Sequence, residues 1–357
     1  FLAAFAAFSL AFLPAGPLAH AADIAPPAIA ATAYVLVDVT SGQTLASQQG
    51  DERRDPASLT KLMTAYLVFD ALRTKKITLT KTFPVSVRAW KMPGSRMFID
   101  PKMQVPVEDL IKGLIVQSGN DAAMALAEGV GGTEEHFVQM MNDEAKALGM
   151  NSTTYKNPDG LPEPGHVTTA RDLATLVVRL RRDFPEYAYF DSIKKYYYPG
   201  TPPSNATNRN GMLFRDPTVD GMKTGYTKEA GYCLIATAKR EFPNVGSRRM
   251  LTIVLGTSSE HARVNESQKL LNWGYTAYDD IKLFDADQPV VTPSVWKGKE
   301  SVLKLGRPQA IVVAVPAGTA SKIKTQVARP DPLVALDAVP QAGGLGRAWD
   351  ALRLWIK

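Results

Sequence analysis

The sequence predicts a mixed α/β (α+β) fold in which one sheet, assembled from strands far apart in the chain, is covered by helices. Strand patterns occur early, over residues 34–39 and from Gln43, and late, over residues 232–238 and 250–256, whereas the residues between these two sets carry mostly helical patterns. Helical blocks between two sets of strands favour one sheet built from both sets. The chain has 357 residues, more than one hydrophobic core usually organises, so a second, smaller domain is also expected.

The first 22 residues have the composition of the apolar body of a secretory signal peptide. Leu, Ala and Phe dominate, and Ala19-His20-Ala21 resembles a small-x-small cleavage site. A buried helix is the alternative, but Pro14 and Pro17 interrupt a helix there. Because neither Met nor a basic segment leads the stretch, we expect a signal peptide over 1–22 that is truncated at its N-terminus, followed by a Pro/Ala-rich linker over 23–32. The sequence therefore predicts export.

The first structured elements are expected to be two strands and a helix. Tyr34–Val39 and the stretch from Gln43 flank Ser41-Gly42, which is a strand-turn-strand signature. Asp55-Pro56 then leads into a helix that starts near Ser58. Its buried face is expected to consist of residues at helical spacing, Leu62, Tyr66 and Phe69.

Helical patterns dominate the middle of the chain. From about Leu110 to Gly149 the pattern is helical, with Thr133 as a candidate N-cap and Gly149 as a candidate C-cap. Thr169-Ala-Arg-Asp172 precedes an apolar run as a capping box would, which gives Asp172 a structural role. The elements expected after it are adjacent strands over 232–238 and 250–256 and a helix over 265–278.

Charge, cysteine and histidine content exclude several classes of function. The net charge is +6, but no Lys/Arg run is interleaved with aromatic residues, so binding of nucleic acid is not expected. The single cysteine, Cys233, excludes an internal disulfide and lies in an apolar run, where we expect it buried. His136, His166 and His261 lack metal-ligand spacing and are expected at the surface or at helix ends, so no metal and no cofactor is predicted.

Three short motifs stand in one order along the chain: Ser58-Leu-Thr-Lys61, Ser118-Gly-Asn120 and Lys223-Thr-Gly225. Ser-x-x-Lys alone is a weak signal because it occurs five times, whereas Ser-x-Asn and Lys-Thr-Gly occur once each. Only the copy at Ser58 precedes both other motifs at the opening of an expected helix. The ordered set predicts an acyl-transferring serine enzyme whose general base is a lysine.

Each motif can place a particular group. Ser58 and Lys61 are three apart and therefore share one helix face, and Lys61 can act as a base when burial or a nearby cation such as Lys223 lowers its pKa. The amide of Ser58, near a helix start, can help to bind an oxyanion. Ser118 can relay a proton, while the Asn120 amide can hold both a substrate carbonyl and the lysine.

The third motif is expected on an edge strand. There Lys223 and Thr224 can bind a terminal carboxylate, and Gly225 removes a side chain that would block a substrate lying along the strand. In isolation, each motif also fits a structural role: a Ser and a Lys on a helix surface, a turn, and a strand end with a glycine. Other hydrolase and nucleotide-binding motifs, G-x-S-x-G and the Walker loop, are absent from the sequence.

The motifs and the phrases around them resemble the low-molecular-mass penicillin-binding proteins that act as D-alanyl-D-alanine carboxypeptidases. The resemblance extends from about Ala33 to Pro340. The matching phrases are Pro56–Thr64, Gly94–Met97, Ile115–Ala122, Asp220–Thr227 and Asn265–Ser267.

This resemblance implies removal of the terminal D-alanine from peptidoglycan stem pentapeptides through an acyl-enzyme on Ser58, with β-lactams as covalent inhibitors. It implies Lys61 as the base and the backbone amides of Ser58 and Tyr226 as the oxyanion hole. It also implies that Arg263 binds the substrate carboxylate; a surface salt bridge from Arg263 to Glu260 or Glu266 is the alternative.

The resemblance also implies the domain organisation. A catalytic domain over 33–280 would contain a five-stranded antiparallel sheet flanked by helices and an all-helical lobe. A small β-rich domain over 281–340, with strand-like runs at 301–305 and 310–315, is expected to be shorter than the usual sandwich of the family and not to close as a complete one. An amphipathic helix over 341–357 would hold the protein, in the periplasm, on the outer face of the inner membrane.

Two alternative functions stay open at the level of sequence. A non-catalytic penicillin-binding or cell-wall-binding protein could keep the fold without turnover. A serine β-lactamase is less favoured, because no Glu-x-x-Leu-Asn pattern lies between Asn120 and Lys223.

Overall fold

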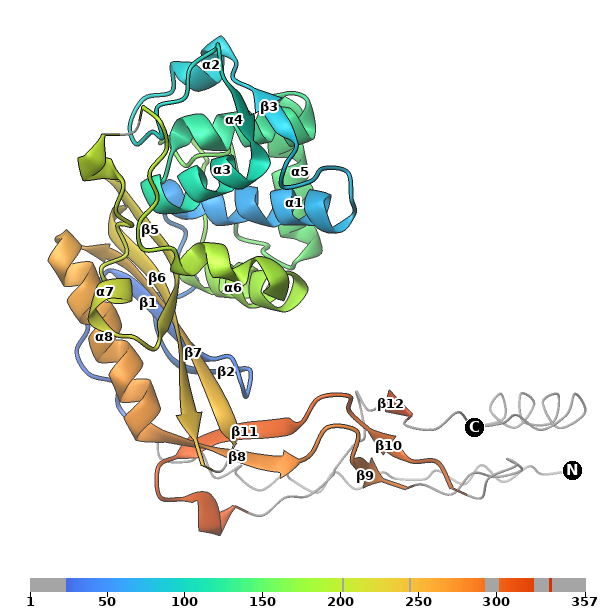
Figure 1. The fold of residues 1–357 in the computed structure, drawn as a ribbon. Coiled ribbons are helices and arrows are strands. Elements are labelled where there is room, and N and C mark those ends of the chain that lie inside the picture. The colour runs from blue at the N-terminus through green and yellow to red at the C-terminus, as the bar shows by residue number, and fades with distance from the viewer. Residues whose placement is uncertain (1–23, 201, 244, 293–301, 324–333, 336–357) are drawn as a thin grey trace, which may run out of the picture.

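The computed structural model describes residues 24–200, 202–243, 245–292, 302–323 and 334–335. In Figure 1 a central sheet has a mostly helical lobe on one side and a long helix along the other, with further strands beyond the end of the sheet. The predicted all-helical lobe also contains a short two-stranded sheet. The expected signal peptide over 1–22 and the expected membrane-associating helix over 341–357 lie outside the described residues.

The central sheet has five antiparallel strands in the order β2-β1-β7-β6-β5. This confirms the prediction of one sheet built from segments far apart in the chain. The motif strand β5 lies at an edge, as predicted. The bounds are β1 Ala33–Asp38, β2 Gln43–Gln48, β5 Val219–Thr227, β6 Gly231–Phe242 and β7 Gly246–Thr257.

Alternating side chains of β1 enter two different hydrophobic cores, because successive residues of a strand face opposite sides of a sheet. Val35 and Val37 belong to the core beneath the helical lobe, whereas Tyr34 and Leu36 belong to the core beneath α8. The sheet is therefore covered on both faces, by α6 (Ala170–Asp183) with the lobe and by α8 (Glu260–Ala277) (Figure 1).

Helix α8 begins five residues before the predicted start at 265. The reason is an N-cap that the sequence interpretation did not use: the Ser259 hydroxyl accepts a hydrogen bond from the backbone amide of Ala262. The earlier start places Arg263 within the first turn of the helix.

The helical lobe is divided into several short elements rather than one continuous pattern. The predicted N-cap is confirmed, since the Thr133 hydroxyl accepts from the amide of His136, and Gly149 has a φ of +81° just after α5. The bounds are η1 Ala57–Thr60, α1 Lys61–Arg73, β3 Thr82–Pro84, α2 Val87–Trp90, β4 Gln104–Pro106, α3 Val107–Lys112, η2 Gly113–Gln117, α4 Asn120–Gly131 and α5 Glu134–Ala147.

Helix α6 begins as predicted, with a difference in how Asp172 is used. The Thr169 hydroxyl accepts from the amide of Asp172, which is the expected N-cap. The Asp172 carboxylate, however, accepts from the Ser152 amide and the Thr153 hydroxyl, and so ties the helix to a neighbouring loop. The remaining short elements are η3 Pro185–Ser192, η4 Pro203–Asn205 and α7 Met212–Arg215.

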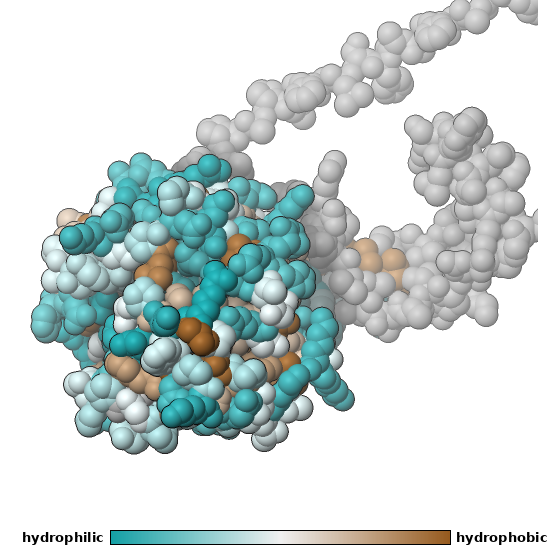
Figure 2. All heavy atoms as spheres, turned by 90° about the horizontal axis from the view of Figure 1, so that it is seen from above, coloured by the Kyte–Doolittle hydropathy of each residue, from teal (hydrophilic) through white to brown (hydrophobic). Residues whose placement is uncertain are grey.

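Apolar side chains concentrate in the two cores rather than on the surface. Viewed from above the lobe, the surface is mostly hydrophilic, with apolar patches that are small and separate (Figure 2). Cys233 is buried, as predicted. No helix in the described part of the chain is both long and apolar enough to cross a membrane.

The strands that follow α8 form two small sheets. Strands β8 (Tyr278–Phe284) and β11 (Ile311–Pro316) pair with each other, and the latter confirms the predicted run at 310–315. Of the predicted run at 301–305, residues 302–305 are described, and Leu305 belongs to strand β10. The second sheet has the order β12-β10-β9, and the remaining bounds are β9 Pro289–Val291, β10 Leu305–Gly306, η5 Ala320–Lys322 and β12 Val334–Ala335.

A buried ionic cluster joins these strands to the central sheet. Arg248 of β7 lies 2.7 Å from the Asp38 carboxylate of β1 and 2.9 Å from the Asp280 carboxylate of β8, and all three side chains are fully buried. The Gln43 side-chain amide exchanges two hydrogen bonds with the backbone of Ala314 in β11. Strand β8 thus crosses the predicted domain boundary at 280 and packs on the first domain. The limits of the two domains, 33–280 and 281–340, stay a prediction.

Candidate active site

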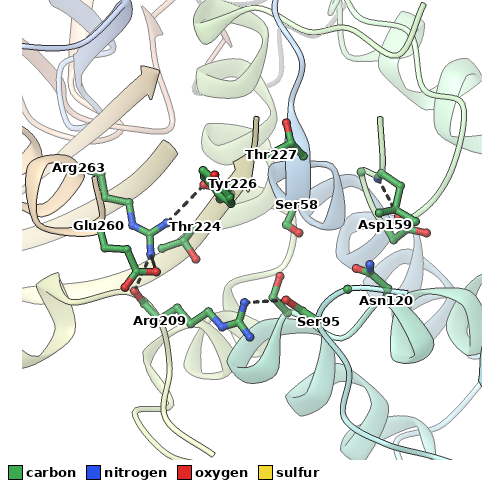
Figure 3. A pocket seen from close by; sticks show the side chains of 15 residues that line it. Ser58, Ser95, Asn120, Asp159, Arg209, Thr224, Tyr226, Thr227, Glu260 and Arg263 are labelled. Atoms are coloured by element: carbon green, nitrogen blue, oxygen red, sulfur yellow. Dashed lines mark hydrogen bonds and ion pairs between the residues drawn. The ribbon is translucent and has the colours of Figure 1, made fainter. Parts of the chain in front are cut away.

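The three motifs meet at one pocket of about 350 Å³. They come from the turn η1 and helix α1, from the junction of η2 with α4, and from the edge strand β5. Ser58 lies between Asn120 on one side and Arg263 on the other (Figure 3). The predicted residues that line the pocket are Ser58, Ser118, Asn120, Thr224, Gly225, Tyr226 and Arg263, while the buried amines of Lys61 and Lys223 contact them.

Ser58 stands in a single 3-10 turn, η1, immediately before α1. The preceding residue, Ala57, has a φ of +47°, an uncommon conformation for a residue with a side chain. A loop packs directly against this turn: a Cβ added at Gly160 would lie 1.8 Å from the carbonyl oxygen of Ala57. The position of the nucleophilic hydroxyl is therefore set by close backbone packing as well as by the helix.

Lys61 is fully buried and its amine has three polar neighbours. Its Nζ lies 3.0 Å from Ser58 Oγ, 2.7 Å from Asn120 Oδ1 and 2.6 Å from the carbonyl oxygen of Asp159. A neutral amine has two hydrogens and one lone pair. Two hydrogens can go to the amide and carbonyl oxygens, which leaves the lone pair for the Ser58 hydroxyl.

Burial is the main reason why the pKa of Lys61 falls from 10.5 to about 8. The Asp159 and Asp121 carboxylates oppose this shift, and the Arg209 guanidinium adds to it. The prediction named burial or a cation such as Lys223. Burial is confirmed as the leading cause, but the cation that lowers the pKa of Lys61 is Arg209.

Ser118 and Lys223 form the second hydroxyl-amine pair of the site. Lys223 Nζ donates to Ser118 Oγ at 2.7 Å and to the carbonyl oxygen of Thr224 at 2.9 Å. Burial, followed by repulsion from Lys61, lowers the pKa of Lys223 well below its ordinary value. Ser118 has a φ of +57°, which turns the chain between η2 and α4. Because the Ser118 oxygen accepts from Lys223, its own hydrogen can be donated toward the pocket.

The Asn120 side chain is held at both ends of its amide. Its oxygen accepts from Lys61, and its nitrogen donates to the carbonyl oxygen of Pro93 at 2.7 Å. These two bonds fix which end of the amide faces the lysine. One hydrogen of the amide nitrogen remains available to a ligand, as the predicted contact with a substrate carbonyl requires.

Gly225 has a packing role besides the one predicted. A Cβ at this position would face the turn that carries Ser58, at 3.2 Å from Ala57 Cβ and 3.3 Å from the carbonyl oxygen of Pro56. The glycine therefore allows strand β5 to lie close to η1. That it also clears space for the substrate stays a prediction. On the pocket side, Thr224 is buried and Tyr226 is half exposed and stacked on Tyr232.

Arg263 lies in the first turn of α8 and is buried, with 2% of its surface exposed. It lines the pocket and contacts the carbonyl oxygens of Gly225 and Arg209 at 3.4 Å each. Its contact with Glu260 is also 3.4 Å long, while Glu266 pairs with Lys269. The alternative of a purely surface salt bridge is therefore wrong, since burial places the guanidinium inside the cleft.

Sequence reasoning missed several residues of the pocket. Arg209 donates to Ser95 Oγ at 2.6 Å across the pocket mouth, and Asp159 supplies the carbonyl oxygen that binds Lys61 (Figure 3). None of them belongs to a periodic pattern. Their only signal was that Ser95 falls in the phrase Gly94–Met97, which was quoted for its resemblance and given no role.

One histidine was also misjudged. His166 is buried, and its Nε2 lies 2.9 Å from Thr60 Oγ1, inside the first motif. Burial lowers its pKa to about 4, so it is neutral and supports the turn. His136 lies at a helix end, as expected, with Nδ1 2.7 Å from the carbonyl oxygen of Gly131. In the described part of the chain, no group of His, Cys, Asp and Glu could hold a metal ion.

The charges of the pocket are distributed unevenly. Arg263 and Arg209 lie at one end together with Glu260, and the Asp159 segment lies at the other, with Ser58 between them (Figure 3). Lys61 and Lys223 lie buried beside the two serines. This arrangement suits a peptide whose carboxylate binds at the arginine end while the carbonyl next to it meets Ser58.

Comparison with known proteins gives a consistent result. Residues 20–259 match the model of the D-alanyl-D-alanine carboxypeptidase family of peptidases, and residues 278–341 match the C-terminal domain of penicillin-binding protein 5. The chain is 38% identical to the D-alanyl-D-alanine carboxypeptidase DacC of Escherichia coli K12, over 98% of this chain and 94% of that protein.

Two solved structures have a similar fold. Penicillin-binding protein 5 from Haemophilus influenzae is 37% identical, with a TM-score of 0.78 over 84% of this chain and 87% of the other. Penicillin-binding protein D2 from Listeria monocytogenes, in its ampicillin-bound form, is 30% identical, with a TM-score of 0.62 over 70% of this chain and 99% of the other.

Proposed function

The chain belongs to the D-alanyl-D-alanine carboxypeptidase family of serine peptidases, and on that premise we propose how its own residues carry out the reaction. Ser58 is the nucleophile and Lys61 is its general base. Ser118 and Asn120 are the proton-relay and orienting residues. The substrate carboxylate is bound at the end of the pocket lined by Thr224, Gly225, Tyr226 and Arg263, with the buried Lys223 behind it.

Acylation starts from the hydrogen bond between Ser58 and Lys61. The neutral amine takes the hydroxyl proton as Ser58 Oγ attacks the carbonyl carbon of the penultimate D-alanine. The backbone amides of Ser58 and Tyr226 bind the oxyanion that forms. The proton then passes to the leaving amine of the terminal D-alanine through Ser118, whose oxygen is held by Lys223 at 2.7 Å.

Hydrolysis of the acyl-enzyme reuses the same base. Lys61 takes a proton from the attacking water and returns it to Ser58 Oγ when the ester breaks, as microscopic reversibility requires. The contacts from Asn120 Oδ1 and the Asp159 carbonyl oxygen hold the amine in place through both steps. The products are the shortened peptide and free D-alanine.

Arg263 and the Lys223-Thr224 pair give the preference for a free carboxyl terminus. The Lys223 amine is buried and already bonded to Ser118, so when protonated it contributes its charge rather than a direct hydrogen bond. Arg263 and the Thr224 hydroxyl contribute direct hydrogen bonds. The substrate class is accordingly the peptidoglycan stem pentapeptide that ends in D-Ala-D-Ala, and β-lactams, which also acylate serine, are covalent inhibitors.

The single observation that carries this proposal is the set of three contacts around Lys61 Nζ. The test is to incubate the full chain with a Lys-D-Ala-D-Ala peptide and separately with penicillin. We expect free D-alanine and a covalent penicillin adduct that mass spectrometry locates on Ser58, and both should be absent in Ser58→Ala. An adduct without D-alanine release would favour the binding-only alternative, and rapid release of hydrolysed penicillin would favour a β-lactamase.

The location and the outer parts of the chain belong to the same proposal. We infer export to the periplasm, supported by the signal-like composition of 1–22, and peripheral attachment to the inner membrane, supported by the amphipathic pattern of 341–357. The limits of the two domains, 33–280 and 281–340, are likewise proposed. Fractionation of cells that express the full chain, with and without 341–357, tests the attachment: the shortened form should move from the membrane to the soluble fraction.

A further inference from the structure

Asp121 follows the second motif and is fully buried, although none of the proposed catalytic steps uses it. Its Oδ1 accepts from the backbone amides of Met97 and Ala122, at 2.9 Å each. Its Oδ2 accepts from the amides of Phe98 and Ile99, at 2.8 and 3.3 Å. The carboxylate therefore accepts from three successive backbone amides of a loop, in addition to one in its own helix. Most of the hydrogen bonds that stabilise this buried charge thus come from one short segment.

The loop that Asp121 binds is unusual in its backbone and its position. Phe98 has a φ of +65°, an uncommon conformation for a bulky residue, which persists only where the surroundings determine it. The same loop supplies Gly94 and Ser95 to the wall of the active-site pocket. Gly119 leaves room for this contact, because a Cβ there would lie 2.7 Å from Asp121 Oδ1.

The other end of the loop binds Asn120, whose side chain contacts the general base Lys61. The carbonyl oxygen of Pro93 accepts from Asn120 Nδ2, and that of Ser95 accepts from the Asn120 backbone amide, both at 2.7 Å. Asn120 Oδ1 in turn accepts from Lys61 Nζ. The hydroxyl of Ser95 accepts from Arg209 at the pocket mouth. One buried carboxylate thus anchors a loop that orients the amide facing Lys61 and carries part of the pocket wall.

We propose that Asp121 is a positioning residue for acylation: it fixes the loop 93–99 so that Asn120 presents its oxygen to Lys61 and Ser95 stands opposite Arg209. This inference rests on the proposed roles of Ser58 and Lys61. The negative charge of Asp121 also acts on Lys61, together with Asp159, Arg209 and Lys223, which are the other charged groups around that amine. Asp121 stabilises the protonated form of Lys61, so removal of its charge lowers the pKa of the base.

The test is the rate of acylation of the full chain by penicillin, measured from pH 5 to pH 10 for wild type and for Asp121→Asn. The amide keeps the size of the carboxylate but directs two N–H hydrogens toward the loop amides, so it can accept from only part of them. We expect the plateau rate to fall between about 10-fold and 100-fold because the amide of Asn120 is displaced. We expect the acid limb of the profile to move to lower pH by about half a unit or more.

Asp172→Asn is the matched control. Asp172 is also a buried carboxylate in the first turn of a helix and also accepts from a loop amide, but it lies outside the pocket. This variant should lose stability without a shift of the acid limb. If Asp121→Asn keeps both the plateau and the limb of wild type, or if Asp172→Asn shifts the limb equally, the role of Asp121 is structural only and the proposal is overturned.

A second measurement covers the case in which Asp121→Asn does not fold. Hydrogen exchange on wild type reports the amides of Met97, Phe98 and Ile99 directly, and we expect slow exchange although they lie in a loop. Exchange as fast as in an unstructured peptide would overturn the proposal. Failure of the proposed function is distinguishable, because then wild type itself would form no adduct on Ser58.

Discussion

The pH dependence of acylation follows quantitatively from the environment of Lys61. With a pKa of about 8, about one molecule in eleven has a neutral lysine at pH 7, against about one in 3,000 at the ordinary value of 10.5. Burial therefore makes the neutral base roughly 300-fold more abundant at that pH. We expect the rate constant of penicillin acylation to rise about tenfold per pH unit below pH 7 and to level off above pH 8.

The matching substitution is Lys61→Arg, because a guanidinium keeps the positive charge but does not release its proton. The acylation rate should fall by about 100- to 10,000-fold, and the inflection near pH 8 should disappear. Lys146→Arg, at an exposed position of α5, is the control and should match wild type. A wild-type profile that is flat from pH 6 to pH 9, or that still rises steeply at pH 10, would refute a neutral Lys61 as the base.

Three further predictions concern the walls of the site and the junction behind it. Gly160→Ala should lower both thermal stability and penicillin acylation, whereas Gly149→Ala, which also has a positive φ but no atom within 4 Å of the new Cβ, should cost only the backbone strain of about 1 kcal/mol. Arg263→Gln should reduce kcat/KM about 10- to 100-fold for a peptide with a free carboxyl terminus and much less for its amide, and Arg215→Gln should change neither value. The pKa of Asp280 is raised to about 7, mainly by burial and then by the Asp38 carboxylate. The contribution of Asp280 to the free energy of unfolding should therefore be complete below about pH 4 and be lost as the pH rises through 7. Urea denaturation of wild type and Asp280→Asn measures this, and an equal pH dependence in both would contradict it.

The parts of the site that could be predicted from sequence are those fixed by local geometry. Ser58 and Lys61 are three residues apart, so the turn η1 running into α1 brings them to 3.0 Å from each other. The turn at Ser118-Gly-Asn120 and the edge strand at Lys223 follow from similar local signals. Their meeting in one pocket was inferred from the order of the motifs and from resemblance rather than from spacing alone.

The parts that could not be predicted depend on contacts between distant segments. Asp159 and Gly160 lie in a loop without periodicity, and only the packing of that loop against Ala57 shows why they matter. Arg209 likewise follows a short irregular stretch. His166 was expected at the surface because sequence gives no information about the partner, Thr60, that its ring meets in the interior.

Gly225 is a case in which strand alternation adds to the interpretation of the sequence. Side chains of a strand alternate between its two faces, so residues 223 and 225 point to the same side. Lys223 points inward, to Ser118. A side chain at 225 would therefore also point inward, toward the turn of Ser58.

The two buried amines of the site must be considered as one titrating system. Lys61 repels the charge on Lys223, so the first proton lost on raising the pH belongs to the pair. Lys61 Nζ has two oxygens besides Ser58 Oγ, which satisfy both hydrogens of a neutral amine and leave its lone pair to the nucleophile. A protonated Lys61 donates its third hydrogen to Ser58 Oγ, so these partners accommodate both protonation states. Only the neutral amine can take the Ser58 proton, so the reactive fraction is set by the titration of the pair.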